Sequence, residues 1–156
     1  MIVIRPADVS DLDAMFELEQ AAFGASAWSR QAIEGELAEL GMSREILIAV
    51  EPNADGDATT MLGHAVGRYV AETADVNRVA VLPDRRRQGV ASQLLAALVG
   101  EADRRGCAQV LLEVAADNAG AIALYAAHGF ETIHRRPGYY DGAVDAVVMQ
   151  RWLGHE

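Results

Sequence analysis

Residues 77–106 read NRVAVLPDRRRQGVASQLLAALVGEADRRG, and this stretch decides the fold. The apolar run Val79–Leu82 has the length and branching of a buried strand. After Gly89 the apolar residues recur at steps of one, three and four, which is typical of a helix with one face in the core. Two arginines followed by Gly106 indicate the end of that helix. The stretch therefore predicts a strand, a tight basic turn and an amphipathic helix.

The turn at Arg86–Ala91, read RRQGVA, has the features of a phosphate site. The first turn of a helix offers N–H groups without intrahelical partners and a partial positive charge, which together suit a phosphate. Gly89 allows a ligand to approach the backbone closely, and Ala91 adds little bulk. The turn lacks the Gly-Lys-Ser/Thr of a Walker A loop and the three glycines of a dinucleotide loop. The open alternative is a solvated turn whose arginines only keep the chain soluble.

Length and charge limit the class of protein. A chain of 156 residues with 51% hydrophobic residues predicts one globular domain, residues 1–156, with a substantial core. The net charge of −10 argues against nucleic acid as a partner, because phosphate backbones need a basic surface. This charge is compatible with a cationic substrate such as an amine, although solubility alone would explain it equally well.

Cysteine and histidine usage gives no sign of a metal. Cys107 is the only cysteine and the four histidines are scattered, so we expect neither an internal disulfide nor a metal site. The apolar start before Arg5 is short for a signal peptide, and no apolar run approaches membrane-spanning length. A cytoplasmic location without a membrane partner is the expectation, and the oligomeric state is not predicted.

Periodicity and turn signals outline the remaining elements. They predict a strand at each of residues 2–5, 46–50, 61–70, 73–82, 109–114, 130–136 and 145–152. Helices are predicted after a cap at Asp8 or Ser10, after Ser29 with Ile33, Leu37 and Leu40 on its core face, after Gly89, and after Asn118. Polar loops are expected at residues 51–60 and 137–144. The order β-α-α-β-β-β-α-β-α-β-β predicts an α/β (mixed α+β) fold with helices on both faces of a sheet.

Glu113 and Tyr125 carry the candidate acid–base chemistry. Glu113 lies in the apolar run LLEVAA, where a core strand favours Val or Ile, so its carboxylate suggests a general base for an amine. The alternative is a side chain that points outward to solvent. Tyr125 lies on an Ala-rich helix, where a tyrosine more often belongs to the core than to catalysis. The strand and helix that carry them are expected to bring both residues to the sheet end where the phosphate turn lies. Cys107 is not expected to carry an acyl group.

The turn and its flanking elements resemble the GNAT acyltransferases, whose signature (Arg/Gln)-x-x-Gly-x-(Gly/Ala) reads here Arg86-x-x-Gly89-x-Ala91. The resemblance covers nearly the whole chain, and it implies a central, mostly antiparallel, twisted sheet of about seven strands. It also implies acetyl-CoA as co-substrate. The residues that this resemblance places at the cofactor are Val79, Ala80, Val81, Arg86, Arg87, Gln88, Gly89, Val90, Ala91 and Asn118.

Four stretches resemble the RimI-type branch of that family, which acetylates the N-terminal alanine of a ribosomal protein. They are Glu17-Leu18-Glu19 to Trp28-Ser29, Val79-Ala80-Val81 with Pro83, Leu112-Glu113-Val114 to Gly129-Phe130, and Arg135-Arg136 to Met149. The resemblance implies that Glu113 accepts a proton and that Tyr125 donates one to the departing thiolate. It places Trp28, Tyr139 and Tyr140 near a peptide groove, although the longer link Gly24–Ala27 and the Pro137-Gly138 pair depart from the branch pattern.

Trp28 has a second interpretation, as a plug of the core between two helices.

The function also has alternatives. A GNAT enzyme for a small amine would fit the acidic charge, whereas the paired tyrosines and the Trp28-Ser29 link favour a peptide. A non-catalytic acyl-CoA sensor would need the turn but neither Glu113 nor Tyr125. The sequence therefore favours an N-acetyltransferase of protein N-termini.

Overall fold

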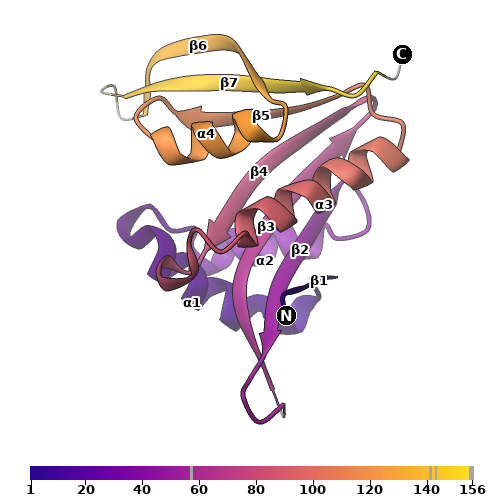
Figure 1. Cartoon of the computed structure of the whole chain (residues 1–156), viewed down its shortest axis with the longest axis vertical. Helices are drawn as coiled ribbons and strands as arrows, with labels where there is room; N and C mark the ends of the chain where they lie inside the picture. Colours follow the sequence, from indigo (N-terminus) through magenta and orange to yellow (C-terminus); the bar gives the residue numbers. More distant parts are fainter. Residues whose placement is uncertain (57, 141, 143, 155–156) are drawn as a thin grey trace. The chain divides into compact units, whose positions relative to one another are not determined.

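The structure is a computed structural model of the whole chain, and it describes residues 1–56, 58–140, 142 and 144–154. In this part of the chain, seven strands form one sheet in the order β1-β2-β3-β4-β5-β7-β6 (Figure 1). The strands and helices follow the predicted order, which confirms the mixed α/β fold. Their bounds are β1 Val3–Pro6, α1 Leu12–Phe23, α2 Arg30–Ala38, β2 Arg44–Pro52, β3 Thr59–Val70, β4 Thr73–Val81, α3 Val90–Arg104, β5 Gln109–Ala115, α4 Ala119–Ala127, β6 Glu131–Tyr140 and β7 Val144–Trp152.

The chain forms two compact units. The first comprises Met1–Arg68 and Arg78–Leu98, and the second comprises Tyr69–Asn77 and Val99–Glu156. Their boundaries fall inside β3, β4 and α3. The division into units does not test the expectation of a single domain over residues 1–156, which stays a prediction.

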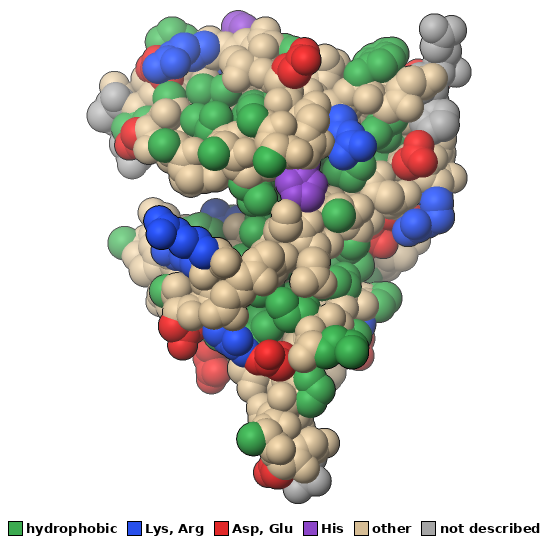
Figure 2. Space-filling view, in the orientation of Figure 1, with side chains coloured by type: hydrophobic (Ala, Val, Ile, Leu, Met, Phe, Trp, Pro, Cys, Tyr) green, Lys and Arg blue, Asp and Glu red, His purple; other side chains and the backbone are tan. Residues whose placement is uncertain are grey.

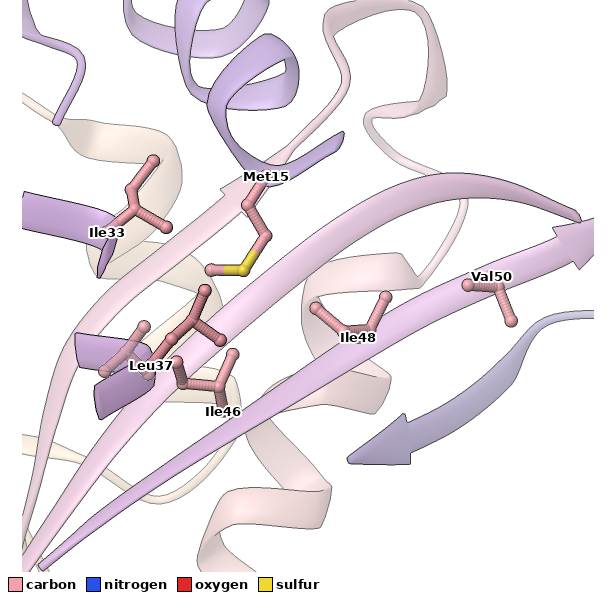
Figure 3. Close-up of a cluster of buried hydrophobic side chains, with 7 residues drawn as sticks. Met15, Ile33, Leu37, Ile46, Ile48 and Val50 are labelled. Atoms are coloured by element: carbon pink, nitrogen blue, oxygen red, sulfur yellow. The ribbon is translucent and has the colours of Figure 1, made fainter. Parts of the chain in front are cut away.

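In the first unit, β2 pairs antiparallel with both β1 and β3. Alternate residues of β2 point to one face, where Ile46, Ile48 and Val50 are buried. Helices α1 and α2 cover this face with Met15 and a set of apolar side chains that Figure 3 shows against β2. The other buried members of this cluster are Ile33, Leu37 and Val66.

The opposite face of β3 carries α3. Gly63 pairs with Ala49, so it faces away from α1. A Cβ atom on Gly63 would lie 2.7 Å from the Ala80 carbonyl oxygen, 3.1 Å from Val90 Cγ1 and 3.2 Å from Leu94 Cδ1. The helix therefore packs directly on the strand backbone, and the predicted apolar face of α3 is confirmed.

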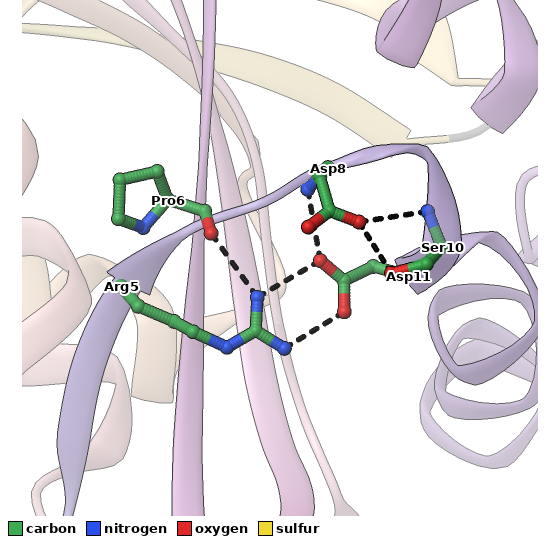
Figure 4. A network of polar contacts seen from close by, with 5 residues as sticks. All are labelled: Arg5, Pro6, Asp8, Ser10 and Asp11. Atoms are coloured by element: carbon green, nitrogen blue, oxygen red, sulfur yellow. Dashed lines mark hydrogen bonds and ion pairs between the residues drawn. The ribbon is translucent and has the colours of Figure 1, made fainter.

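The start of α1 is fixed to β1 by a polar network (Figure 4). The Arg5 guanidinium donates to both carboxylate oxygens of Asp11, at 2.9 and 2.8 Å. Asp11 also accepts from the Asp8 amide at 2.9 Å, and Asp8 accepts from the Ser10 amide at 2.8 Å. The hydrogen bond from Arg5 holds the pKa of Asp11 below its usual value. The predicted helix cap is displaced: Asp8 caps the 3-10 turn Val9–Asp11 that leads into α1, and the N-cap residue of α1 itself, Asp11, makes no side-chain cap hydrogen bond.

In the second unit, β4 runs parallel to β5, and β7 pairs antiparallel with β5 and β6. Its apolar core includes Val110, Leu112 and Val114 of β5 together with Phe130 and Met149. Cys107 is buried in this unit, and burial raises the pKa of its thiol. A buried thiol with a raised pKa is a poor nucleophile, which agrees with the expectation for Cys107.

Several element boundaries differ from the sequence prediction by one or two residues; for example, β2 runs to Pro52 and β3 starts at Thr59, so the predicted loop 51–60 is shorter at both ends. The predicted loop at residues 137–144 is wrong at its start, because β6 continues to Tyr140 across a register irregularity between Arg136 and Tyr140. Gly138 adopts a φ of +60°, so the Pro137-Gly138 pair is accommodated within the strand as a bulge-like irregularity. Similarly, α2 ends at Ala38, so Leu40 packs against the core from beyond the helix.

Candidate functional site

The basic turn lies in the first unit, between β4 and α3. The 3-10 turn Pro83–Arg85 follows β4, Arg87 and Gly89 have φ values of +65° and +84°, and α3 begins at Val90. A left-handed φ is costly for a residue with a Cβ atom, and Gly89 meets it without strain. The predicted order of strand, basic turn and helix is confirmed, and the helix starts directly after Gly89 as predicted.

The arginines of this turn have different contacts. Arg85 pairs with Glu51 and donates to the Gln88 side chain at 3.0 Å. Arg86 donates to the Ala22 carbonyl at the end of α1, at 3.1 Å. Arg86 therefore anchors the turn to α1. On the face shown in Figure 2, basic side chains are interspersed with acidic and neutral surface and form no single patch.

Two observations indicate that the turn can accommodate a phosphate group. Apart from its two chain neighbours, no atom of the described residues lies within 4 Å of the position that a Cβ atom of Gly89 would occupy, so the space beside the turn is open. The first amides of α3, at Val90 and Ala91, have no intrahelical partners and carry the positive end of the helix dipole. A diphosphate could therefore approach the backbone at Gly89.

The end of β4 leaves the β5 ladder. The parallel register between β4 and β5 runs from Thr73↔Gln109 to Val76↔Leu112. The segment Val79–Val81 lies beyond this register. Its Ala80 side chain is buried, whereas Val79 and Val81 are half-buried. A strand that continues past its ladder presents backbone groups along one side, which is the kind of edge to which an extended ligand adds.

Glu113 lies on β5 in the second unit with its side chain 31% exposed. The buried residues of β5 alternate with it, so the Glu113 side chain points away from the core, as one of its two interpretations predicts. Arg136 of β6 lies 3.3 Å from the Glu113 carboxylate, and the same guanidinium lies over the Tyr139 ring at 5.6 Å. The Tyr139 side chain is exposed. The side chain of Tyr140 lies outside the described part of the chain.

Tyr125 is 9% exposed on α4, with its ring centroid 6.0 Å from that of Phe130. It is thus a core residue in its packing, and a catalytic role for it stays a prediction. Asn118 caps α4, because its side-chain oxygen accepts from the Ala121 amide at 3.1 Å. This cap gives Asn118 a structural role besides its predicted contact with the cofactor.

The Pro137-Gly138 pair is held by Asp145 of β7. The Asp145 carboxylate accepts from the Gly138 amide at 2.9 Å and from Arg135 at 2.6 Å. The amide hydrogen bond, followed by that from Arg135, lowers the pKa of Asp145. A carboxylate that stays ionised here fixes the strand just before Tyr139.

Sequence reasoning missed a cluster of polar and charged side chains in the first unit, formed by Glu19, His64 and Arg78. Glu19 and His64 have no exposed surface. The Glu19 carboxylate accepts from Arg78 Nη2 at 2.7 Å, from Arg78 Nε at 3.1 Å and from the Trp28 amide at 2.9 Å. His64 Nε2 lies 3.0 Å from Glu19, which is an ion-pair distance without hydrogen-bond geometry, and His64 Nδ1 has no hydrogen-bond partner in the described structure.

This cluster determines the state of Glu19. Burial alone would raise the pKa of Glu19, but His64, Arg78 and the Trp28 amide together lower it to about 2. The sequence held one signal, because Glu19 follows the core residue Met15 by four positions and so lies on the buried side of α1. Trp28 is half-buried and packs against the core of the first unit, which fits a core plug, and its predicted place in a peptide groove stays a prediction.

Comparison with known proteins now identifies the family. The model of the acetyltransferase (GNAT) family matches residues 12–130. The chain belongs to this family. It is 35% identical over 152 residues to the [ribosomal protein bS18]-alanine N-acetyltransferase of Escherichia coli K12, covering 96% of each chain.

Solved structures agree with this assignment. The crystal structure of the ribosomal-protein-S18-alanine N-acetyltransferase from Escherichia coli matches 100% of this chain and 96% of that chain with a TM-score of 0.87 and 33% identity. The NatC complex bound to Gag peptide and CoA matches 97% of this chain and 98% of its own, with a TM-score of 0.84 and 23% identity, and so shares the fold.

Two further observations concern the described residues alone. None of their helices combines the length and apolar character needed to cross a membrane. They contain no group of three or more His, Cys, Asp and Glu side chains suited to a metal ion.

Proposed function

We propose that this protein is an acetyl-CoA-dependent N-acetyltransferase that acts on the N-terminal α-amine of a protein. The observation that carries the proposal is the 35% identity with the Escherichia coli enzyme along 96% of both chains. The ribosomal protein bS18 for which that enzyme is named is the first substrate to test, with alanine as its N-terminal residue.

The turn Arg86–Ala91 would hold the pyrophosphate of the co-substrate. The open space at Gly89 and the amides of Val90 and Ala91 support this assignment. Arg87 and Gln88 would contribute further contacts to the pyrophosphate from the same turn. Arg86 would instead hold the turn in place through its hydrogen bond to the end of α1. Val79–Val81 would pair by backbone hydrogen bonds with the pantetheine arm, because this segment extends beyond the β5 ladder. Asn118 is proposed as a further contact with that arm.

Glu113 would take the proton from the amine, directly or through a water, as the amine nitrogen bonds to the thioester carbonyl. When bound, acetyl-CoA supplies an acetyl group activated as a thioester. A strand amide near Val81 would stabilise the negative charge that develops on the carbonyl oxygen. Tyr125 would give its proton to the thiolate that leaves. The new amide bond and the broken C–S bond then balance without a redox partner.

The α-amine suits a single carboxylate base. Its pKa is about 7.7–8.0, compared with about 10.4 for a lysine side chain, so it deprotonates more readily near neutral pH. Trp28, Tyr139 and Tyr140 are proposed to contact the peptide. The exposed Tyr139, with Arg136 over its ring, is available for such a contact.

The test is release of coenzyme A from acetyl-CoA across an amine panel. The panel contains peptides with free N-terminal Ala, Ser, Gly and Met, the same peptides blocked at the N-terminus with an internal lysine, and common small amines. All 13 cationic residues of the chain are arginine, so mass spectrometry can assign any lysine acetylation to the substrate.

Turnover confined to free N-termini supports the proposal and ranks the first residue. Turnover on small amines alone replaces the substrate class while keeping the cofactor. Binding of acetyl-CoA without turnover on any amine supports the acyl-CoA sensor instead.

A further inference from the structure

The cluster of the buried Glu19 and His64 with the partly exposed Arg78 lies outside the residues assigned to catalysis or to the cofactor. It joins α1, β3 and β4 within the first unit. Burying these groups costs desolvation energy, and apolar residues of similar volume would often fill such a space with equal or greater stability. The cluster therefore calls for an explanation beyond stability.

Arg78 holds the link between α1 and α2 in one place. Its guanidinium lies 3.8 Å from the centroid of the Phe23 ring and 5.1 Å from that of Trp28. It also donates to the Ser26 carbonyl at 3.2 Å. With the Trp28 amide bound to Glu19 at 2.9 Å, the segment Phe23–Trp28 is fixed at both ends and in the middle.

The position of Arg78 in the chain gives this anchor a consequence. The next residue is Val79, the first of the segment Val79–Val81 proposed to meet the acetyl-CoA arm. The planar fork of an arginine can bind a carboxylate, a carbonyl and two aromatic faces together, which a lysine cannot do. Arg78 thus couples the location of Trp28 to the strand beside the acetyl group, through contacts that all lie in one unit.

We propose that Arg78 is a positioning residue for the substrate peptide: it sets the place of the Phe23–Trp28 wall, with Glu19 and His64 as its buried support. This inference rests on the proposed function. Arg78 itself does not touch the substrate. Its loss should weaken use of the peptide while leaving the binding of acetyl-CoA largely intact, because the turn Arg86–Ala91 has its own hydrogen bond, from Arg86 to the Ala22 carbonyl, within α1 and before the Phe23–Trp28 segment.

The test compares Arg78→Lys and Glu19→Gln with Arg30→Lys. Arg30 is a matched control, since it pairs with Asp13 and lies 4.8 Å from the Phe16 ring, but at an exposed site. For Arg78→Lys we expect kcat/KM for an Ala-peptide to fall roughly tenfold to 100-fold, mostly through KM. The dissociation constant of acetyl-CoA should stay within about twofold. Arg30→Lys should change neither value.

Two readouts do not depend on turnover. In a Trp152→Phe background, Trp28 is the only tryptophan, and its emission should shift to longer wavelength in Arg78→Lys as the ring becomes more exposed. Hydrogen exchange at the Trp28 amide should accelerate in Glu19→Gln, because the carboxylate that accepts this hydrogen is weakened. Both signals should remain at the wild-type value in Arg30→Lys.

The outcomes separate the two proposals. Wild-type turnover on free N-termini, with a peptide KM in Arg78→Lys no higher than in Arg30→Lys, overturns the role of Arg78 alone. An equal loss of peptide use and acetyl-CoA binding also overturns it, since that pattern reports general loosening of the unit. Wild-type protein that acetylates no free N-terminus overturns the proposed function itself.

Discussion

Arg136 on β6 lies 3.3 Å from the carboxylate of Glu113 on β5, although strand β7 runs between them. Glu113 pairs with Val148 and Arg136 pairs with Ala146, so the two side chains share one face, two positions apart along the central strand. The guanidinium therefore reaches across β7 to the proposed base. The Glu113 carboxylate is therefore paired with a cationic side chain in this structure.

Replacing Glu113 by Gln should lower kcat while leaving acetyl-CoA binding unchanged. The amide cannot accept the amine proton, and general-base catalysis contributes about 100-fold to 10,000-fold. Steady-state kinetics on an Ala-peptide, with calorimetry for acetyl-CoA, measures both quantities. Glu101→Gln is the matched control, because Glu101 is a partly exposed carboxylate that also pairs with arginines, Arg104 and Arg105. A kcat for Glu113→Gln equal to that of Glu101→Gln would remove Glu113 from the mechanism.

Replacing Tyr125 by Phe should preserve the core and lose a proton donor. The ring still packs against Phe130, so we expect the unfolding free energy to change by only about 1 kcal/mol. The kcat should fall by about 100-fold if the phenol protonates the thiolate. The control is Tyr69→Phe, because Tyr69 is also 9% exposed. Similar kcat values for the two variants, from pH 6 to pH 9, would leave Tyr125 with packing alone.

Local sequence signals predicted the elements that local chemistry builds. Ser29 accepts from the Ala32 amide as the predicted cap of α2, and Asn118 does the same for α4. Gly89 has the left-handed φ that its place in the turn suggested. These features depend on residues within a few positions of each other, so one window of sequence contains the whole interaction.

The missed features depend on distant parts of the chain. Arg78 and Glu19 lie 59 residues apart, and no pattern within either segment indicates that they meet. The same is true of Arg136 and Glu113, which come together only once β7 has paired with both of their strands. The polar support of the proposed site could therefore not be predicted from periodicity, whereas the strand and turn that would hold the cofactor could.

Replacing Gly89 by Glu should abolish binding of acetyl-CoA in a folded protein. A carboxylate in the open space beside the turn would repel a pyrophosphate, and we expect the affinity to fall by at least about 100-fold. Gly89→Ala is the control, because it shares the strain of a φ of +84° but adds neither charge nor length. Calorimetry and circular dichroism measure binding and folding. Tight binding by Gly89→Glu would refute the pyrophosphate assignment.

Replacing Gly63 by Ala should destabilise the first unit. The new methyl group would lie 2.7 Å from the Ala80 carbonyl oxygen, a backbone atom that can move only with its strand. We expect a loss of about 1–3 kcal/mol in unfolding free energy, measured by urea denaturation. Gly35→Ala on α2 is the control, because no described atom outside the local backbone of α2 lies within 4 Å of its Cβ position and alanine favours the helix, by up to about 1 kcal/mol. Equal stability of the two variants would contradict the close packing of α3 on β3.

The buried charge of Glu19 should make stability depend on acid pH in a defined window. Its pKa is about 2 in the folded protein compared with 4.5 ordinarily, so the unfolded chain binds the proton first as the pH falls. The stabilisation is then complete above about pH 4.5 and is lost between that pH and about pH 2; the shift corresponds to about 3 kcal/mol. Urea denaturation at pH 7, 5, 4 and 3 should show a smaller loss for Glu19→Gln than for wild type, from a lower unfolding free energy at pH 7 because the partly exposed Arg78 loses its carboxylate partner. Asp11→Asn removes another carboxylate of lowered pKa, and it should leave the Glu19 component of the slope in place. Parallel pH profiles for wild type and Glu19→Gln would show that the Glu19 carboxylate is not held ionised by Arg78 and His64.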